Sequence, residues 1–552
     1  MSAHAIHHMT VETSDKSWKR GFWSIWATQF QESFSDLAYR WLVISFVTHM
    51  AIDAESTREY LKALAGILFA APFVLFSPTG GFLADRYSKR LVILGTKFAE
   101  MLVMGVALAG LALGSLPIML LALFLRGIQS SCYSPSKFGM LPEVLPEARL
   151  SWGNGVVELG SFIAIVAGTV AGTTLYSRFS GQLVYAGIIL FAVTLIGVLL
   201  SATLPRVPPA GGTKPLRINP FSGLGEEWKA MRQDRTLFLA VLGITYFFML
   251  ATLLQLAVND YGLEVLKVGS DRTGYLLAAI GIGIGLGSVA AGYLSGGKIE
   301  YGLVPLGAAG MTVFSLLFSR GPDFLTAALL VGVLGFAGGF FAVPVMAIIQ
   351  HRPDPARKGG IIAASNQLSF IGVGLAGVIY AGLTALLHLS VPSVFLVGGL
   401  MTLVATIYAI KLMPDALLRL VVWVLVHSVY RMRVQGRENV PAKGGALLVC
   451  NHLSLVDALL LGGSTDRHIR FLMFKGLYDR PIIGLFARAA RAIPISSDQR
   501  PREMIRSLRT ASEAIRNGGV VCIFAEGQMT RIGQMLPFRR GFERIMKNIM
   551  RQ

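Results

Sequence analysis

The stretch GGFLADRYSKR, residues 80–90, decides the fold because it is a short basic loop between two long apolar runs. The first ~410 residues contain about twelve such runs, and each is long enough to cross the ~30 Å of hydrocarbon in a bilayer. Only 15% of the 552 residues are charged, whereas a soluble protein carries roughly 25%. The sequence therefore predicts a polytopic α-helical membrane protein.

The apolar runs form two sets of six around a long polar connection. Basic residues gather in alternate short loops, and such loops stay in the cytoplasm. Both ends of the twelve-helix unit are therefore expected to be cytoplasmic, and no small-residue cleavage site marks a signal peptide. The predicted parts are a cytoplasmic N-terminus at 1–20, a six-helix bundle at 21–203, a cytoplasmic loop at 204–236, a second six-helix bundle at 237–412 and a cytoplasmic, membrane-associated domain at 413–552.

Two sets of six helices around a central loop are the layout of the major facilitator superfamily, whose halves are built from inverted three-helix repeats. The stretch 80–90 resembles the signature of that superfamily, with Ser88 in place of its second glycine. An aspartate at a helix end among arginines can hold neighbouring helices together, so the motif is expected to be conformational. The matching positions are Gly81, Leu83, Asp85, Arg86, Lys89 and Arg90.

Two further stretches, 125–146 (LRGIQSSCYSPSKFGMLPEVLP) and 339–370 (GFFAVPVMAIIQHRPDPARKGGIIAASNQLSF), resemble bacterial lysophospholipid transporters of the LplT type. The resemblance runs over nearly all of residues 21–411. It implies that the membrane part moves lysophosphatidylethanolamine-like lipids inward across the inner membrane. The alternative is an exporter of a drug or another amphiphile, because the stretch 80–90 carries no information on substrate.

Several ionisable or amide side chains fall within the spans, where they usually face a cavity. Glu32, Asp36 and Arg40 recur every four residues and are expected to share one face of the first helix. A polar face in an apolar helix is what a path for a lipid headgroup needs. An internal Asp36–Arg40 ion pair is the alternative. The candidate pathway residues are Glu32, Asp36, Arg40, Arg126, Asn154 and Glu158.

The segment after the twelfth run changes character. Its first part, DALLRLVVWVLVHSVYRMRV, is apolar, short for a span, and could lie in the membrane interface. Buried strands at GALLVC, IRFLMF and VVCIF then alternate with helices, which indicates an α/β domain. From Pro414 onward there are roughly 22 Lys and Arg against roughly 10 Asp and Glu. Beside a membrane this favours anionic lipid or an acidic carrier over nucleic acid.

A histidine and an aspartate follow the first of these strands, in CNHLSLVDALLL. Ser454 is expected to cap the next helix with Asp457 at its third position. At such a strand–loop–helix junction Asp457 can accept from one imidazole nitrogen of His452 and leave the other as a general base. Later, FAEG ends a buried strand at Glu526 and Gly527, followed by arginines that suit a phosphate.

These blocks together resemble the glycerolipid acyltransferases of the PlsC type. The resemblance implies that His452 deprotonates the glycerol hydroxyl of a lysophospholipid and that Asp457 orients it. The acyl donor would be a thioester of acyl carrier protein or coenzyme A. Glu526 and Gly527 would bind the glycerophosphate, with Arg531 as the partner of the phosphate. No cofactor or metal is expected, since the three cysteines are far apart.

The fourth block of that family, an apolar strand with a proline, does not occur before Gln552. The acyltransferase domain is therefore expected to be incomplete. Related bacterial fusions of the Aas type carry an acyl-carrier-protein synthetase after the same two parts, and such a module could follow here. The alternatives are a transporter with an inactive or scaffolding C-terminal domain, and an acyltransferase with a passenger membrane anchor.

Overall fold

A computed structural model describes residues 3–50, 55–212, 219, 221, 223–441, 443–495, 501–530 and 534–550. The chain divides into two compact units, Met1–Ile407 and Tyr408–Gln552. The division falls inside the last helix of the membrane part, close to the domain boundary predicted from the sequence. Within its described residues the first unit contains helices and loops but no strand, whereas the second alternates strands with helices.

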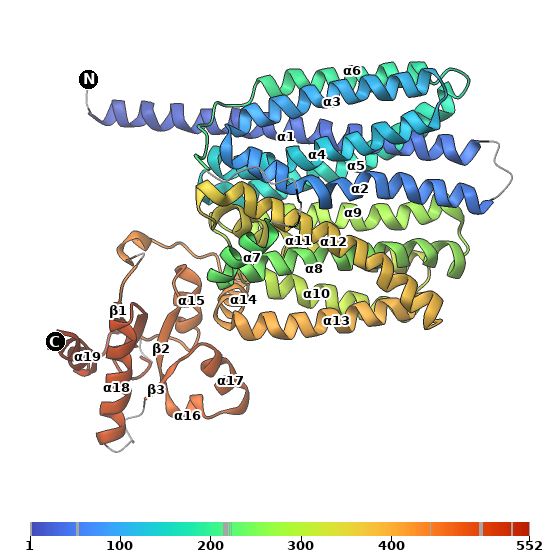
Figure 1. The fold of residues 1–552 in the computed structure, drawn as a ribbon. Helices are drawn as coiled ribbons and strands as arrows, with labels where there is room; N and C mark the ends of the chain where they lie inside the picture. The colour runs from blue at the N-terminus through green and yellow to red at the C-terminus, as the bar shows by residue number, and fades with distance from the viewer. Residues whose placement is uncertain are drawn as a thin grey trace. The chain divides into compact units, whose positions relative to one another are not determined.

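The first unit has the twelve-helix layout that the sequence predicts, in two groups of six (Figure 1). Among the described residues, ten helices are long and apolar enough to cross a membrane. The other two of the twelve are α1, which carries polar residues, and α10, which has 16 residues. The first group is α1 (Ala3–His49), α2 (Glu55–Arg86), α3 (Lys89–Ala112), α4 (Leu116–Val144), α5 (Leu150–Phe179) and α6 (Val184–Ala202). The second is α8 (Arg235–Asp260), α9 (Gly269–Leu294), α10 (Leu303–Phe318), α11 (Phe324–His351), α12 (Lys358–Ala381) and α13 (Val391–Leu412).

The connection between the two groups holds a helix that the sequence analysis did not predict. Helix α7 (Leu224–Gln233) buries Glu227 and Met231 and packs against α8 and α12. Asp234 ends it and caps α8, because its carboxylate accepts from the backbone amides of Thr236 and Leu237 at 3.0 and 3.2 Å. Helix α7 was missed because it has only ten residues, several of them charged. The helical repeat of its apolar residues is therefore too weak to distinguish it from a polar loop.

Small residues let the helices of each group approach closely, as is usual in membranes. A side chain at Gly172 of α5 would lie 2.3 Å from the carbonyl oxygen of Ala38 on α1. One at Gly287 of α9 would lie 2.0 Å from the carbonyl oxygen of Phe336 on α11. Helix α1 is thereby held against α5, which positions its polar face toward α3 and α4.

The second unit is a parallel four-stranded sheet in the order β1-β4-β2-β3 with helices around it. The strands are β1 (Ala446–Cys450), β2 (Ile469–Phe474), β3 (Ile493–Ile495) and β4 (Val520–Phe524). The helices are α14 (Pro414–Val429), α15 (Asp457–Ser464), α16 (Lys475–Tyr478), α17 (Pro481–Ala489), α18 (Pro501–Arg516) and α19 (Gly541–Met550). The predicted α/β class is confirmed, and β3 is a strand that the sequence analysis did not predict. In such sheets ligands bind outside the carboxyl ends of the strands, where the strand order reverses.

Candidate functional site

A cluster of five buried charges joins α1, α3 and α4. Arg126 of α4 forms ion pairs with Asp36 and, at 2.8 Å, with Glu100 of α3. Lys97 forms ion pairs with Glu32 and, at 2.8 Å, with Glu100. The side chains of all five residues are at least nine-tenths buried. Glu32, Asp36 and Arg126 were candidates from the sequence, whereas Lys97 and Glu100 were missed.

Uncharged polar side chains complete this cluster. Ser130 donates to Glu32 or Asp36, at 3.1 and 3.0 Å. Gln129 donates to Glu32 at 3.0 Å, and Gln31 donates to Glu100 at 3.1 Å. Buried ions are tolerated only where pairing and hydrogen bonds replace water. Charged and polar side chains from three helices of the first group therefore form one buried cluster among apolar residues.

Arg40 does not join this cluster, although it lies on α1 four residues after Asp36. Its guanidinium lies 5.9 Å from the centre of the Phe69 ring, beside Gly66 of α2. Asp36 is paired with Arg126 instead, so the alternative of an internal Asp36–Arg40 pair is not what the structure contains. A partner 90 positions away in the chain was not visible in a pattern of four-residue spacing.

The two candidates on α5 have different neighbours. Asn154 exchanges two hydrogen bonds of 2.8 Å with Gln350 of α11, a reciprocal amide pair between the two groups of helices. Glu158, one turn further along, is close enough to Lys137 of α4 for the two charges to interact. The structure therefore places Asn154 at a junction of the halves and Glu158 beside a buried cation.

The second group of helices contrasts with the first. Its buried side chains form one extensive apolar cluster over α8, α10, α11, α12 and α13. Within the described parts of α8–α13, the buried polar side chains are hydroxyls and amides, apart from Lys358 at the start of α12. They are Thr273, Ser288, Thr312, Ser315, Gln350, Lys358, Ser365, Gln367, Ser369, Thr402 and Thr406.

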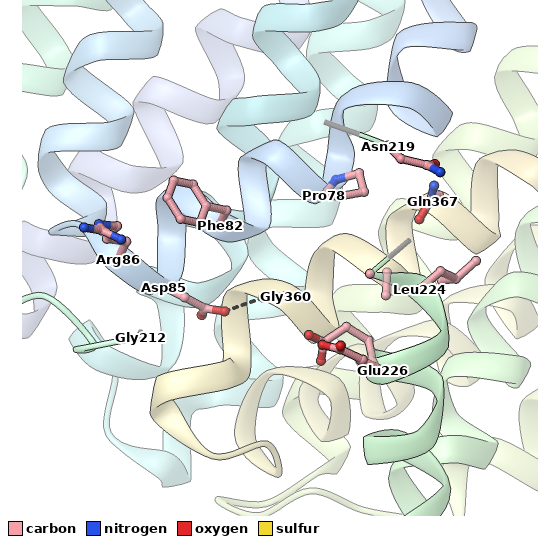
Figure 2. A pocket seen from close by; sticks show the side chains of 13 residues that line it. Pro78, Phe82, Asp85, Arg86, Gly212, Asn219, Leu224, Glu226, Gly360 and Gln367 are labelled. Atoms are coloured by element: carbon pink, nitrogen blue, oxygen red, sulfur yellow. Dashed lines mark hydrogen bonds between the residues drawn. The ribbon is translucent and has the colours of Figure 1, made fainter. Parts of the chain in front are cut away.

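The stretch 80–90 holds the two groups of helices together at one end. The carboxylate of Asp85 accepts from the backbone amides of Gly359 and Gly360, at 2.6 and 2.9 Å, at the start of α12. Figure 2 shows the second of these bonds. A negative charge is stabilised there by the unpaired amides and the helix dipole. Gly81 permits the approach, since a side chain there would lie 2.9 Å from the carbonyl oxygen of Gly359.

The basic residues of the same stretch act locally. Arg90 donates to the carbonyl oxygens of Leu204 and Ala202, at 2.8 and 3.0 Å, and so ties α3 to the end of α6. The guanidinium of Arg86 lies over the ring of Phe82 at 5.7 Å. Beside them is a pocket between α2, α7 and α12, into which Asp85 and Glu226 extend (Figure 2). Helix α7 therefore forms a wall next to this junction.

His452 and Asp457 lie together just after β1 in the second unit. The Nδ1 atom of His452 is 2.9 Å from the Oδ2 atom of Asp457, and the imidazole stacks on Phe524 with ring centres 4.1 Å apart. The backbone amides of Leu453 and Ser454 donate to the same oxygen at 2.7 and 2.8 Å. The ring is thus held in position through Nδ1, while its Nε2 atom accepts or donates no hydrogen bond among the residues that the structure describes.

The start of α15 corrects one detail of the sequence analysis. The helix begins at Asp457 itself, so this residue is not at the third helical position, and Ser454 accepts only a long 3.4 Å contact from the amide of Val456. Burial raises the pKa of Asp457, but the hydrogen bonds from Ser454, His452 and Leu453 outweigh burial and hold that pKa below its ordinary value. Asp457 is therefore a carboxylate at neutral pH.

Glu526 follows β4, the strand beside β1. Its side chain is buried, and both oxygens are occupied: one accepts from the amide of His452 and the other from the amide of Leu536, each at 3.0 Å. Gly527 has a positive φ of 69°, and a side chain there would meet Arg539 at 2.7 Å. Arg531 lies outside the described residues. The guanidinium next to this turn in the structure is that of Arg539.

The candidate residues His452, Asp457 and Glu526 all follow the carboxyl ends of β1 and β4, which are neighbouring parallel strands. Among the described residues, the Nε2 atom of His452 has no hydrogen-bond partner, and Arg539 lies against the turn that follows β4. No group of three or more His, Cys, Asp or Glu side chains that could hold a metal ion occurs within the described ranges. The chemistry that these residues can perform is general acid–base catalysis with electrostatic binding of an anion.

Comparison with known proteins assigns families to both units. The Major Facilitator Superfamily profile matches residues 33–377, and the Acyltransferase profile matches residues 431–550. The lysophospholipid transporter LplT of Citrobacter koseri is 27% identical over 372 residues, which are 65% of this chain and 87% of the relative. LplT of Salmonella typhi is 27% identical over 404 residues, which are 70% and 92% of the two chains.

Solved structures support the same fold for the first unit. The transporter FucP in its outward conformation aligns with a TM-score of 0.59 at 13% identity, covering 71% of this chain and 98% of FucP. The human organic anion transporter MFSD10 also aligns with a TM-score of 0.59, at 15% identity over 71% of this chain and 99% of its own. At these identities the likeness concerns the fold alone.

Proposed function

Because the chain belongs to the major facilitator superfamily and carries an acyltransferase domain, we propose that it moves lysophospholipids across a bacterial inner membrane and reacylates them. The direction is inward, and the relatives named above are lysophospholipid transporters. Both ends of the twelve-helix unit are cytoplasmic in this proposal, so the acyltransferase domain meets the lipid on the side to which it is delivered. A direct tether raises the effective concentration of the delivered lipid at the second site.

The proposal of lysophospholipid transport is supported by one contrast: the first group of helices buries charged side chains, whereas the second buries mostly apolar ones. A lysophospholipid has one charged headgroup and one acyl chain. The cluster around Glu32, Asp36 and Arg126 brings charges of both signs together, as recognition of a zwitterionic headgroup requires, whereas the buried side chains of the second group are mostly apolar, as the acyl chain requires. A transporter of a uniformly polar solute would need polar groups on both walls.

The proposal of acyltransferase activity rests on the Nε2 atom of His452, the ring nitrogen that is not paired with Asp457. In the proposed step Nε2 accepts the proton of the free glycerol hydroxyl while that oxygen attacks the carbonyl carbon of an acyl thioester. A carbon–oxygen bond forms, the carbon–sulfur bond breaks, and the imidazolium returns its proton to the thiolate that leaves. Asp457 holds the ring and stabilises its charged form. The donor is an acyl carrier protein or coenzyme A thioester.

The glycerophosphate is proposed to bind beside the turn after β4. The side chain of Glu526 is buried and each of its oxygens accepts from one backbone amide, so its part is to position the His452 loop. Gly527 lets the backbone come close to the ligand, and Arg539 supplies a cation next to it. Arg531, four residues beyond Gly527, remains the second candidate for the phosphate.

The transport part is tested with Asp36→Ala and Glu158→Ala in cells that take up labelled lysophospholipid. Both substitutions should lower uptake at equal protein level, because each removes a charge from the path of the headgroup. Thr312→Val on α10, which removes a buried hydroxyl from the apolar half, is the matched control and should leave uptake unchanged. Full uptake by both acidic-site variants would refute the headgroup path.

A further inference from the structure

Arg40 of α1 is a cation without a counter-charge. Among the residues that the structure describes, it makes no ion pair or hydrogen bond, and no charged side chain lies close enough to interact with it. It lies nine residues before the end of α1 at His49, which is about 14 Å along a helix. A cation at that depth in a membrane segment is costly unless an anion meets it, and such residues are usually functional.

The neighbouring cations of the first group of helices already have carboxylate partners. Arg126 and Lys97 are each paired with two carboxylates of the buried cluster, and Lys137 of α4 interacts with Glu158. A phosphate that approached one of these cations would have to compete with the carboxylates of the protein. The cluster itself contains three carboxylates and two cations, so it favours an ammonium group over an anion. A zwitterionic headgroup therefore needs a further cation for its phosphate.

The surroundings of Arg40 leave the N–H donors of its guanidinium available. The group lies 5.9 Å from the centre of the Phe69 ring on α2, a contact that holds a cation without using its donors. Its Nε atom is buried and has no partner, whereas its two terminal nitrogens are not buried. Gly66 leaves room for them, because a side chain there would lie 3.3 Å from one of these nitrogens. A planar guanidinium with unoccupied donors can bind a phosphate through two parallel hydrogen bonds.

A row of aromatic rings leads from Arg40 to the second group of helices. Phe69 lies beside Phe73 with ring centres 5.9 Å apart, and Phe73 stacks on Phe370 of α12 with ring centres 4.1 Å apart. Apolar rings next to one isolated cation suit an amphiphile, because its phosphate and its acyl chain need neighbouring places of opposite character. A free inorganic anion would gain nothing from the rings.

We infer that Arg40 binds the phosphate of the transported lipid and that the aromatic row from Phe69 to Phe370 receives the beginning of its acyl chain. Arg40 lies four residues after Asp36, about 6 Å along α1, so an amine on the headgroup can extend toward the carboxylates of the buried cluster. The inference rests on the proposed transport function for the identity of the lipid. The ligand class that the site itself recognises is an amphiphile with a phosphate next to its chain.

The site is tested by equilibrium binding to the purified full chain in detergent. Labelled lysophosphatidylethanolamine is displaced by lysophosphatidic acid, by a monoacylglycerol of the same chain length, or by inorganic phosphate. Lysophosphatidic acid should bind about tenfold more tightly than the monoacylglycerol, which has no phosphate, and inorganic phosphate should bind far more weakly than either lipid. Equal affinity for the two lipids would overturn the inference. Displacement by inorganic phosphate at the concentration of the lipid would show a site for free phosphate and would overturn it too.

Variants assign the preference for phosphate to Arg40. Arg40→Leu should bind lysophosphatidic acid about tenfold more weakly and the monoacylglycerol as before, because only the phosphate loses its hydrogen bonds. Gly66→Val keeps the charge but crowds the guanidinium, and should also weaken binding of the phosphate-bearing lipid selectively. Arg178→Leu, which removes an exposed cation in the last turn of α5, is the matched control and should keep both affinities. An equal loss for the two lipids in Arg40→Leu, or no loss for either, would overturn the inference.

Binding and transport together separate this inference from the proposed function. If the unaltered chain preferred lysophosphatidic acid through Arg40 but moved no lysophosphatidylethanolamine across a vesicle membrane, the transport proposal would fail and the phosphate site would stand. If the unaltered chain and Arg40→Leu moved lysophosphatidylethanolamine with the same KM and kcat, the transport proposal would stand and the phosphate site would fail.

Discussion

The candidate carboxylates of the two units have very different hydrogen-bond and ion-pair partners. In the membrane unit, Glu32, Asp36 and Glu100 are all paired with the cations Lys97 and Arg126 from neighbouring helices. In the acyltransferase unit, the carboxylates of Asp457 and Glu526 accept mainly from backbone amides. The first arrangement is a closed network between helices, and the second is a support for one imidazole.

Because of this difference, we expect substitutions in the two units to affect different properties, folding stability in one and reaction rate in the other. A closed network of buried ions is sensitive to the loss of any member, because the partner then keeps a buried charge without compensation. An imidazole with one occupied and one available nitrogen can be removed with little effect on the surrounding loops. Substitutions should therefore reduce folding stability in the membrane unit and reaction rate in the acyltransferase unit.

The largest effect is expected for His452→Ala. Loss of a general base typically lowers a rate by about 10²–10⁴-fold, while thermal stability should change little because Asp457 keeps its two backbone donors. Acylation of labelled lysophospholipid and the midpoint of thermal unfolding are measured side by side. His468→Ala is the matched control, since that histidine precedes β2 at the opposite edge of the sheet and contacts the carbonyl oxygen of Ala490. A normal acylation rate in His452→Ala would break the comparison.

Arg126→Leu should have the second largest effect and act on stability. It leaves Asp36 and Glu100 buried without their cation, which costs about 3–5 kcal/mol for a buried pair. Arg40→Leu is the matched control, because Arg40 forms no ion pair among the described residues and packs on Phe69. Thermal unfolding in detergent distinguishes them: a lower midpoint for Arg126→Leu alone is expected. Equal midpoints would mean that Asp36 and Glu100 do not depend on Arg126 to compensate their buried charges.

Glu526→Gln should give a smaller, purely catalytic loss. One of the two amides that now meet a carboxylate oxygen would face an NH₂ group, so the His452 loop would shift. We expect a fall in kcat of about ten- to a hundredfold, the range seen when a positioning contact is lost, with little change in KM for lysophospholipid. A large rise in KM with kcat retained would instead indicate that Glu526 contacts the substrate.

The smallest effect concerns pH. The pKa of Asp457 is lower in the folded unit than in an unfolded chain, so this carboxylate stabilises the folded loop at pH values above its unfolded pKa of about 3.9. That contribution is lost as the pH falls through the lower folded pKa. Hydrogen exchange of the Leu453 and Ser454 amides, corrected for intrinsic rates, should show protection at pH 6 that declines below about pH 4. Asp457→Asn should remove this pH dependence.

The sequence predicts the helices better than their partners. Long apolar runs indicate the membrane-spanning helices, and the expected strand-to-helix junction placed His452 next to Asp457. The Arg126–Asp36 pair was not predicted, because its members are far apart in the chain and only helix packing brings them together. Lys97 and Glu100 were missed for the same reason. Two charges one helical turn apart look, in the sequence, like an exposed pair at the membrane interface. Likewise, nothing in FAEG reveals that each oxygen of Glu526 accepts from a backbone amide.

The central claim is that the product of transport is the substrate of acylation. It is tested most directly in proteoliposomes whose acyltransferase domain and acyl-thioester donor share one side, with labelled lysophospholipid added to the opposite leaflet. We expect the unaltered chain to acylate this lipid, whereas Asp36→Ala should acylate it only when it is supplied in the leaflet on the side of the domain. Equal acylation by both chains from the opposite leaflet would contradict the account.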